Sequence, residues 1–140
     1  MSIKHLDHLN LTVSNLEESI AWYAAVFGFE VVERGKREGG PWAIIKSGES
    51  TLCIYQDKSR VPPTQFGEDD RTRHVIYHFG FRITDRAAWL RKVEEQDLVL
   101  HHGGENHYPH SRSWYVCDPT GYSIEVVLWD EDEIRFDPAA

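Results

Sequence analysis

The stretches HLDHLNLTV at residues 5–13 and VIYHFGFRI at residues 75–83 decide the fold of this chain. When the chain is shifted by 70 positions, His8 falls on His78, and the apolar residues that follow each histidine coincide. These apolar residues alternate with other residues, a period of two that is typical of a β-strand with one face toward a core. The repeat predicts two copies of one supersecondary unit.

A helix is expected after each of these strands. Residues 14–17, SNLE, fit a capping box, in which the serine and the glutamate side chains bond to free backbone N–H groups. Gly28 is expected to end this first helix, because glycine tolerates positive φ. The second helix is expected from Asp85 to about Glu95, with no glycine directly after it.

Three further strands are expected in each half, separated by turns rich in glycine and proline. We therefore predict an α+β fold in which two βαβββ modules form one domain over residues 1–140. Module 1 covers about 4–57, a polar linker 58–73, module 2 about 74–129, and an acidic tail 130–140. The expected strands are 29–34, 42–47 and 51–56 in module 1 and 99–102, 113–117 and 122–129 in module 2, with loops at 36–40 and 103–112.

The composition excludes some classes of partner. The 140 residues carry a formal net charge of −8, so no basic surface is expected for nucleic acid or anionic lipid. No apolar stretch has the roughly 18 residues of a membrane span, and the first residues do not resemble a signal peptide. We therefore expect a cytoplasmic protein. Cys53 and Cys117 are expected to be buried free thiols rather than a disulfide.

Three residues have the pattern of a metal site. His8 and His78 occupy equivalent positions on the polar faces of the two repeated strands, and Glu125 lies in the last strand of the second repeat. A shift of 73 aligns Leu52 of the first repeat with Glu125. Two imidazoles and one carboxylate bind Fe2+, Mn2+, Zn2+ or Ni2+ and leave coordination positions open. We predict one divalent metal, with Fe2+ or Mn2+ favoured, held by His8, His78 and Glu125.

Several motifs resemble those of the vicinal oxygen chelate superfamily, which comprises glyoxalases, bleomycin-resistance proteins and extradiol dioxygenases. They are DHLNLTV at residues 7–13 with FGF at 27–29, YHFGF at 77–81, and DPTGYSIE at 118–125. The resemblance covers about residues 4–129. It implies mixed sheets curved into a cup and a metal that chelates two neighbouring oxygens of a small-molecule substrate. It also implies a homodimer with a shared active site, in which His8 can enter the site of the partner chain.

The resemblance favours some reactions over others. Glyoxalase I and methylmalonyl-CoA epimerase use a fourth Glu or Gln ligand where this alignment has Leu52, so both activities are disfavoured. Fosfomycin-inactivating enzymes share the three ligands and a tyrosine ten residues before the glutamate, here Tyr115. The thiol-transferring ones carry threonine where this chain has Asn10. Arg82 and Arg112 are the candidate cations for a substrate anion.

Extradiol dioxygenases resemble the C-terminal part most, so ring cleavage is the leading prediction. In that case His107 is the acid/base, and Tyr115 donates a hydrogen bond to the reacting oxygen. A metal-free drug-binding protein of the same fold is the alternative of another class, and there aromatic side chains such as Trp42 stack on the drug. The candidate substrate-binding residues are Asn10, Trp42, Arg82 and Arg112.

Overall fold

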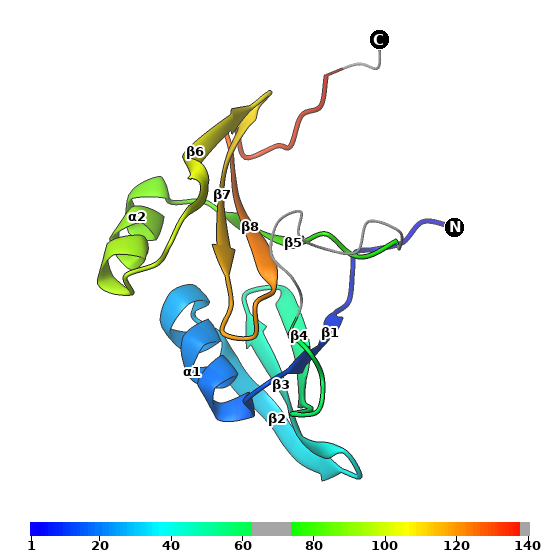
Figure 1. Ribbon diagram of the computed structural model, residues 1–140. Coiled ribbons are helices and arrows are strands. Elements are labelled where there is room, and N and C mark those ends of the chain that lie inside the picture. The colour runs from blue at the N-terminus through cyan, green and yellow to red at the C-terminus, as the bar shows by residue number, and fades with distance from the viewer. Residues whose placement is uncertain (63–73, 138–140) are drawn as a thin grey trace. The chain divides into compact units, whose positions relative to one another are not determined.

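The structure is a computed structural model that describes residues 1–62 and 74–137. The chain divides into two compact units, Met1–Pro63 and Thr64–Ala140. Parts of the predicted linker and tail, residues 63–73 and 138–140, lie outside the described residues. Within the described ranges each unit holds one helix and one sheet of four strands (Figure 1). No helix in these ranges is long and apolar enough to cross a membrane.

Unit 1 is a strand, a helix and three further strands. The four strands lie in the order β1-β4-β3-β2. The first strand pairs in parallel with the last, whereas the other neighbours are antiparallel. A parallel pair needs a crossover connection, which the helix and the two intervening strands provide. The elements are β1 (Leu9–Val13), α1 (Leu16–Phe27), β2 (Glu30–Arg37), β3 (Gly40–Ser47) and β4 (Ser50–Gln56).

Unit 2 repeats this topology with the strand order β5-β8-β7-β6, and β5 again pairs in parallel with the last strand. The two units confirm the predicted α+β fold of two βαβββ modules. The elements are β5 (Phe79–Ile83), α2 (Arg86–Glu95), β6 (His101–Tyr108), β7 (Ser111–Cys117) and β8 (Ser123–Trp129).

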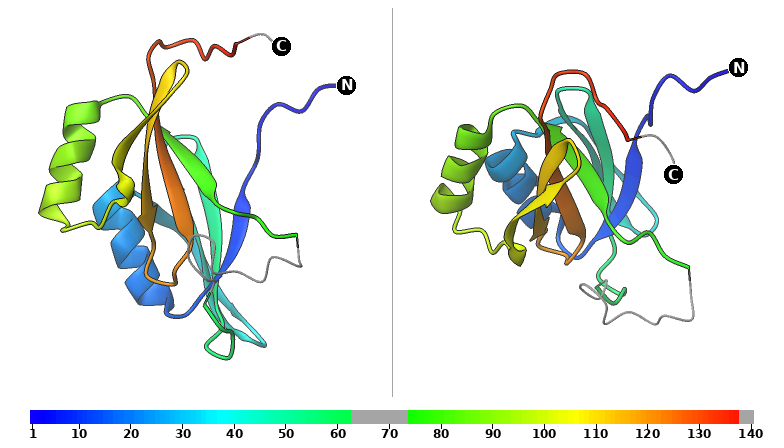
Figure 2. Two further views of the ribbon diagram at one scale, coloured as in Figure 1. Left: turned by 45° about the horizontal axis from the view of Figure 1, so that its top comes forward. Right: turned by 90° about the horizontal axis from the view of Figure 1, so that it is seen from above.

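In unit 1 the helix α1 covers one face of the sheet and packs over β2, β3 and β4 (Figure 2). Tyr23 of the helix is fully buried and meets the ring of Phe29 edge-on. Burying each large apolar side chain contributes about 1.5–3 kcal/mol. The apolar strand residues therefore face α1, and the residues that alternate with them lie on the opposite face of the sheet. The buried strand residues are Leu11, Val13, Ala43, Ile45, Leu52 and Ile54.

The sheet of unit 2 also has one apolar face and one mixed face. Trp114 pairs with Val126 on β7 and β8, and both side chains are almost fully buried. Because neighbouring strand residues point to opposite faces, Tyr115 and its partner Glu125 lie together on the other face. The apolar pairing thus fixes the side from which the predicted carboxylate ligand projects.

The loops expected at 36–40 and 103–112 are largely strand. β2 continues to Arg37, and β6 runs from His101 to Tyr108. The register between β6 and β7 shifts between His101 and Asn106, where Gly103 and Gly104 have positive φ. A bulge of this kind lets a strand continue past residues that break its alternation. The polar, glycine-rich composition of residues 103–112 therefore led to the prediction of a loop where the structure has most of β6.

The N-terminal cap of α1 is Asn15, so the predicted capping serine, Ser14, was wrong by one residue. The Asn15 side chain accepts a hydrogen bond of 3.0 Å from the backbone N–H of Glu18. At the equivalent position of unit 2, Asp85 accepts a bond of 2.9 Å from the backbone N–H of Ala88. Gly28 follows the helix with φ 68°, as predicted. The two repeats thus begin their helices in the same way.

The alignment of Leu52 with Glu125 was also wrong by one residue. In the parallel pairs, Asn10 lies opposite Cys53, and Gly80 lies opposite Glu125. Because Asn10 and Gly80 are equivalent in the repeat, Cys53 is the counterpart of Glu125, and Leu52 points to the buried face under α1. A shift of one residue moves a side chain to the opposite face of a sheet. The position in unit 1 that corresponds to Glu125 is therefore Cys53, which is neither the Glu nor the Gln expected of a fourth ligand.

We expect Asn15→Ala to lower the free energy of unfolding by about 0.5–2 kcal/mol, because the backbone N–H of Glu18 loses its acceptor. Asn15→Ser, which keeps a side-chain oxygen, should retain most of the stability. Urea denaturation followed by circular dichroism measures both variants. Equal stability of wild type and Asn15→Ala would contradict the assignment of this cap.

Candidate functional site

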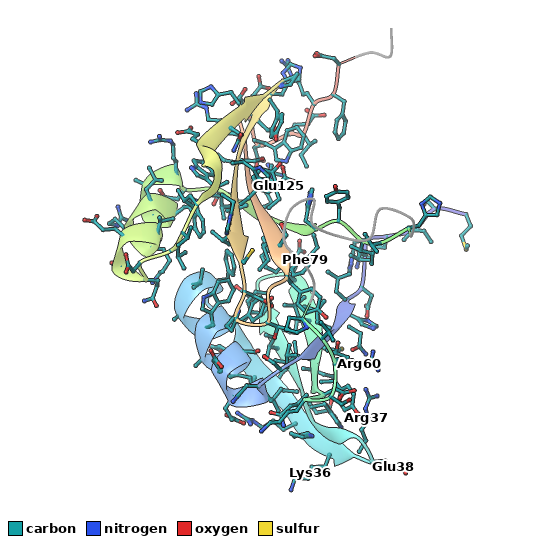
Figure 3. The ribbon with its side chains drawn as sticks, viewed as in Figure 1. Lys36, Arg37, Glu38, Arg60, Phe79 and Glu125 are labelled. Carbon is teal, nitrogen blue, oxygen red and sulfur yellow. The ribbon has the colours of Figure 1, made fainter. Side chains whose placement is uncertain are left out.

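The two predicted metal ligands of unit 2, His78 and Glu125, lie side by side. The parallel register places Gly80 opposite Glu125, and His78 precedes Gly80 by two positions on the same side of the chain. The Nε2 atom of His78 is 3.4 Å from the Oε2 atom of Glu125. Both side chains remain partly accessible, with 35% and 21% of their surfaces exposed. Figure 3 shows Glu125 on β8 of the second sheet.

Tyr115 holds the second oxygen of this carboxylate. Its hydroxyl donates a 2.9 Å hydrogen bond to Oε1 of Glu125, which leaves Oε2 toward His78. The hydroxyl of Tyr108 lies 2.9 Å from that of Tyr115. A phenol has only one proton to donate. Since Tyr115 gives its proton to Glu125, Tyr108 must donate to Tyr115, and the three groups form a directed chain.

Tyr115 is suited to act as a permanent donor. Burial raises the pKa of its phenol, and the hydrogen bonds with Tyr108 and Glu125 raise this pKa further, together with the negative charge of Glu125. The side chain is only 8% exposed. The phenol therefore stays protonated over the physiological pH range and remains a hydrogen-bond donor to Glu125. The ring of His78 meets the Tyr115 ring nearly edge-on, with centroids 5.7 Å apart.

The spacing of His78 and Glu125 fits a shared metal ion. Atoms bound to one ion at about 2.1 Å, with angles of about 90–110°, lie about 3.0–3.4 Å from each other. The observed 3.4 Å between Nε2 and Oε2 falls at the upper end of this range. This distance is therefore compatible with a single ion held between the two side chains. Tyr115 would then orient the carboxylate ligand from behind.

His8, the third predicted ligand, belongs to unit 1. Its Nδ1 atom is 2.8 Å from Oδ2 of Asp7, and this hydrogen bond is the main cause of the lowered pKa of the Asp7 carboxyl. In a neutral imidazole, a hydrogen bond from Nδ1 to a carboxylate leaves the lone pair on Nε2, which is the tautomer that a metal-binding imidazole needs. The local geometry of His8 therefore fits the role of a ligand.

The predicted acid/base, His107, lies on the opposite face of its sheet from Tyr115. His107 pairs with Arg112 across the β6–β7 hairpin, and Arg112 is three residues from Tyr115 along β7. Its ring is 69% exposed and lies 3.6 Å from Glu105. The structure thus does not bring His107 together with the pair of predicted ligands in unit 2.

The two predicted substrate-binding arginines have local partners. Arg112 lies 3.5 Å from Glu105, which also accepts a 2.6 Å bond from Arg86 at the start of α2. This bond to Arg86 is the main cause of the lowered pKa of Glu105. Arg82 lies on β5 on the same face as Glu125, and it donates a 2.6 Å bond to the backbone carbonyl of Asp132. Both arginines therefore tie segments of unit 2 together.

The other two predicted substrate-binding residues, Asn10 and Trp42, belong to unit 1 and line one pocket of its sheet. Cys53 lines the same pocket. Both cysteines of the chain are free and partly buried, and burial raises the pKa of each thiol. Two of the four substrate-binding residues that were predicted from the sequence therefore line the same pocket.

Sequence reasoning missed Tyr108 and His102. The ring of His102 meets that of Tyr115 edge-on, with centroids 4.9 Å apart. A turn at residues 109–110 joins β6 to β7 and pairs Tyr108 with Ser111. Recognising that turn would have placed Tyr108 on the face of Tyr115. His102 gave no such signal, because its position follows from the bulge, where its own φ is 56°.

Known proteins resemble this chain over most of its length. Catechol-2,3-dioxygenase of Bacillus subtilis (strain 168) is 26% identical over 125 residues, which are 87% of this chain and 40% of that protein. The chain thus spans well under half of that relative. Metallothiol transferase FosB of Staphylococcus epidermidis (strain ATCC 12228 / FDA PCI 1200) is 23% identical over 128 residues, which are 90% of this chain and 82% of FosB.

A solved structure shares the fold. The glyoxylase/bleomycin resistance protein/dioxygenase domain from Frankia sp. EAN1pec superposes with a TM-score of 0.76 at 18% identity, covering 94% of this chain and 96% of that one. The sequence model of one family matches residues 5–126, which confirms the resemblance found in the sequence. The chain belongs to the Glyoxalase/Bleomycin resistance protein/Dioxygenase superfamily.

Proposed function

We propose that this protein is a metal-dependent enzyme that acts on a small oxygenated substrate, with extradiol-type ring cleavage as the leading reaction. His8, His78 and Glu125 are the proposed ligands of one divalent metal. The observation that carries the proposal is the convergence of His78 and Glu125 at 3.4 Å, with Tyr115 holding the second carboxylate oxygen. A carboxylate fixed in this way beside an imidazole is the arrangement expected of metal ligands.

The proposed donor set also indicates the kind of metal. Two imidazole nitrogens and one carboxylate oxygen, with open positions, are typical of Fe2+ oxygenases, and the same set binds Mn2+, Zn2+ or Ni2+. When bound, such an ion supplies Lewis-acid chemistry for two neighbouring substrate oxygens. Partial exposure of His78 and Glu125 leaves room for a substrate to approach them. Iron and manganese are the favoured ions.

The protein side chains have separate roles in this proposal. Tyr115 keeps Oε2 of Glu125 directed toward His78, and Tyr108 holds the Tyr115 hydroxyl in place. Asp7 lies 2.8 Å from Nδ1 of His8 and would favour the tautomer that leaves Nε2 for the metal. His107 is not part of the proposal, because its side chain lies on the face of the sheet opposite Glu125.

A thiol transferase of the fosfomycin-resistance type is the second candidate. One observation favours it: the chain covers 82% of FosB but only 40% of catechol-2,3-dioxygenase. The ligand set proposed here is the same for both reactions, so the identity of the metal and the reaction must separate them. Oxygen uptake with catechols, in protein that retains iron, supports ring cleavage. Thiol addition to fosfomycin, in protein that retains manganese, supports the second candidate.

Removing one ligand tests the metal site. We expect wild-type protein purified without chelator to retain about one transition-metal ion per chain, and His78→Ala to lose it, because a two-ligand site binds far more weakly. His74→Ala, in the exposed segment before β5, is the matched control and should retain the ion. Elemental mass spectrometry measures the metal content of all three proteins. Equal metal content in wild type and His78→Ala would rule out this site.

The tyrosine that holds Glu125 should affect metal affinity without being a ligand. We expect Tyr115→Phe to weaken metal binding by about 10–100-fold, the usual cost of losing a group that orients a ligand. Tyr108→Phe should have a smaller effect, because it leaves the bond from Tyr115 to Glu125 in place. Competition against a chelating dye measures both affinities. An unchanged metal affinity in Tyr115→Phe would contradict the proposed role of Tyr115 in orienting the Glu125 carboxylate.

We further propose a homodimer in which His8 of one chain completes the site of its partner. Two inactive variants, His8→Ala and Glu125→Ala, should then restore metal binding when their subunits are mixed, because each mixed dimer contains one intact site. In a random mixture about a quarter of the sites recover, since half of the dimers are mixed. Elemental analysis after refolding the mixture, with sedimentation to confirm the dimer, measures this. No recovery in a proven mixed dimer would mean that each site uses its own His8.

A further inference from the structure

A pocket of about 140 Å³ lies on the sheet of unit 1, on the face opposite α1. The strand register places its side chains in two neighbouring rows across the sheet. Asn10, Cys53 and Ile44 form one row, and Tyr55 with Trp42 belong to the next. Arg37, near the end of β2, closes one side. The pocket is therefore a built part of one sheet, with polar, apolar and cationic walls.

Two glycines allow the aromatic walls to approach the backbone closely. A Cβ atom added to Gly35 would come within 2.4 Å of the Trp42 ring. A Cβ atom added to Gly39 would come even closer to the hydroxyl of Tyr55. Glycine in a strand or turn often marks such a close approach. Trp42 and Tyr55 thus pack closely over the backbone of Gly35 and Gly39.

Arg37 brings the positive charge of this pocket. The carbon of its guanidinium lies 3.6 Å from the centre of the Tyr55 ring, which is a stacked cation–π contact. Stacking uses the face of the guanidinium, whereas its N–H donors lie in the plane and point outward. Among the described residues, no carboxylate forms a hydrogen bond or ion pair with Arg37. The outer edge of Arg37 can therefore receive an anionic group.

The neighbouring residue provides an internal comparison. Lys36 precedes Arg37 on β2 and, by strand alternation, points to the other side of the hairpin (Figure 3). Arg60, a cation that follows β4, is already paired with Asp57 at 2.8 Å. Of these three cations, Arg37 is the one that lines the pocket.

We propose that this pocket binds a single aromatic ring that carries a carboxylate. A cavity of about 150 Å³ is large enough for one benzene molecule, so a pocket of about 140 Å³ that is open on one side has room for a single ring. Trp42 supplies the main aromatic contact, and Tyr55, whose ring Arg37 covers on one face, adds its edge. The planar guanidinium of Arg37 matches a carboxylate with two parallel N–H···O bonds. An aliphatic anion would leave the aromatic walls unused, and a neutral ring would leave Arg37 unpaired.

This inference names the substrate class of the proposed enzyme. It rests on the proposed function only in taking the bound molecule to be the substrate. His8 is two positions before Asn10, one of the pocket residues, so the proposed metal ligand of unit 1 adjoins the pocket in sequence. A ring held by its carboxylate at Arg37 would have its position relative to β1 fixed. Arg37 is accordingly a specificity-determining residue.

Calorimetric titration of the full chain with benzoate, benzamide and acetate tests the proposal. Benzoate should bind about tenfold or more tightly than either benzamide, which lacks the charge, or acetate, which lacks the ring. Arg37→Gln should weaken benzoate binding by about tenfold or more and leave benzamide unchanged, while Arg37→Lys falls between. Lys36→Gln removes the same charge outside the pocket and should bind benzoate like wild type.

The same titration on His78→Ala separates the pocket from the metal. Retained benzoate binding in this variant supports the pocket even if the metal site fails. Loss of binding there would assign benzoate to the metal and overturn the inference. The inference would also be overturned if the three probes bound with equal affinity or if benzoate did not bind at millimolar concentration. The same holds if Arg37→Gln left the benzoate affinity unchanged, or if Lys36→Gln lowered it equally.

Discussion

The parallel pairing of the first and last strands is the constraint on which the candidate chemistry depends. In unit 2 it places Gly80 opposite Glu125, and this brings His78 to within 3.4 Å of the carboxylate. The buried pairs Trp114–Val126 and Val116–Ile124 hold the same register from the neighbouring strand. A slip of one residue would turn Glu125 toward the apolar face, where an ionised carboxylate is costly. The core therefore fixes the position of the proposed ligand.

The two repeats use one scaffold for different purposes. In each, the first strand pairs in parallel with the fourth, and the helix begins at an Asn or Asp cap. The position of Glu125 in unit 2 is that of Cys53 in unit 1. Unit 2 gathers two proposed metal ligands and the tyrosine that supports them, whereas unit 1 carries His8 and a pocket with aromatic walls. A duplicated fold has thus diverged at equivalent positions.

Much of the fold was predictable because alternation and repetition are visible in the sequence. The pattern around His8 and His78 depends only on residue type and spacing, and it gave the two modules and most of the strands correctly. The placement of Leu52 failed because the turns before the two last strands differ in length, which sequence shifts cannot show without the register. The capping prediction failed because Ser14 and Asn15 are both good caps, and only the geometry distinguishes them.

The details of the site were less predictable. His107 and Tyr115 were expected to act in one active site, but the turn that pairs Tyr108 with Ser111 places His107 opposite Arg112, on the other face of the sheet. The hydrogen bonds from Tyr108 to Tyr115 and on to Glu125 depend on that same hairpin. Backbone bulges and turns therefore limited the prediction more than residue identity did, since Tyr108 and His102 were missed through their positions on the hairpin and the bulge.

Anomalous diffraction from crystals of the metal-loaded protein tests the central claim most directly. The account predicts one strong metal peak about 2.0–2.3 Å from both Nε2 of His78 and Oε2 of Glu125, with Tyr115 still bonded to Oε1. A fully occupied metal elsewhere, with His78 and Glu125 bound to no ion, would contradict it.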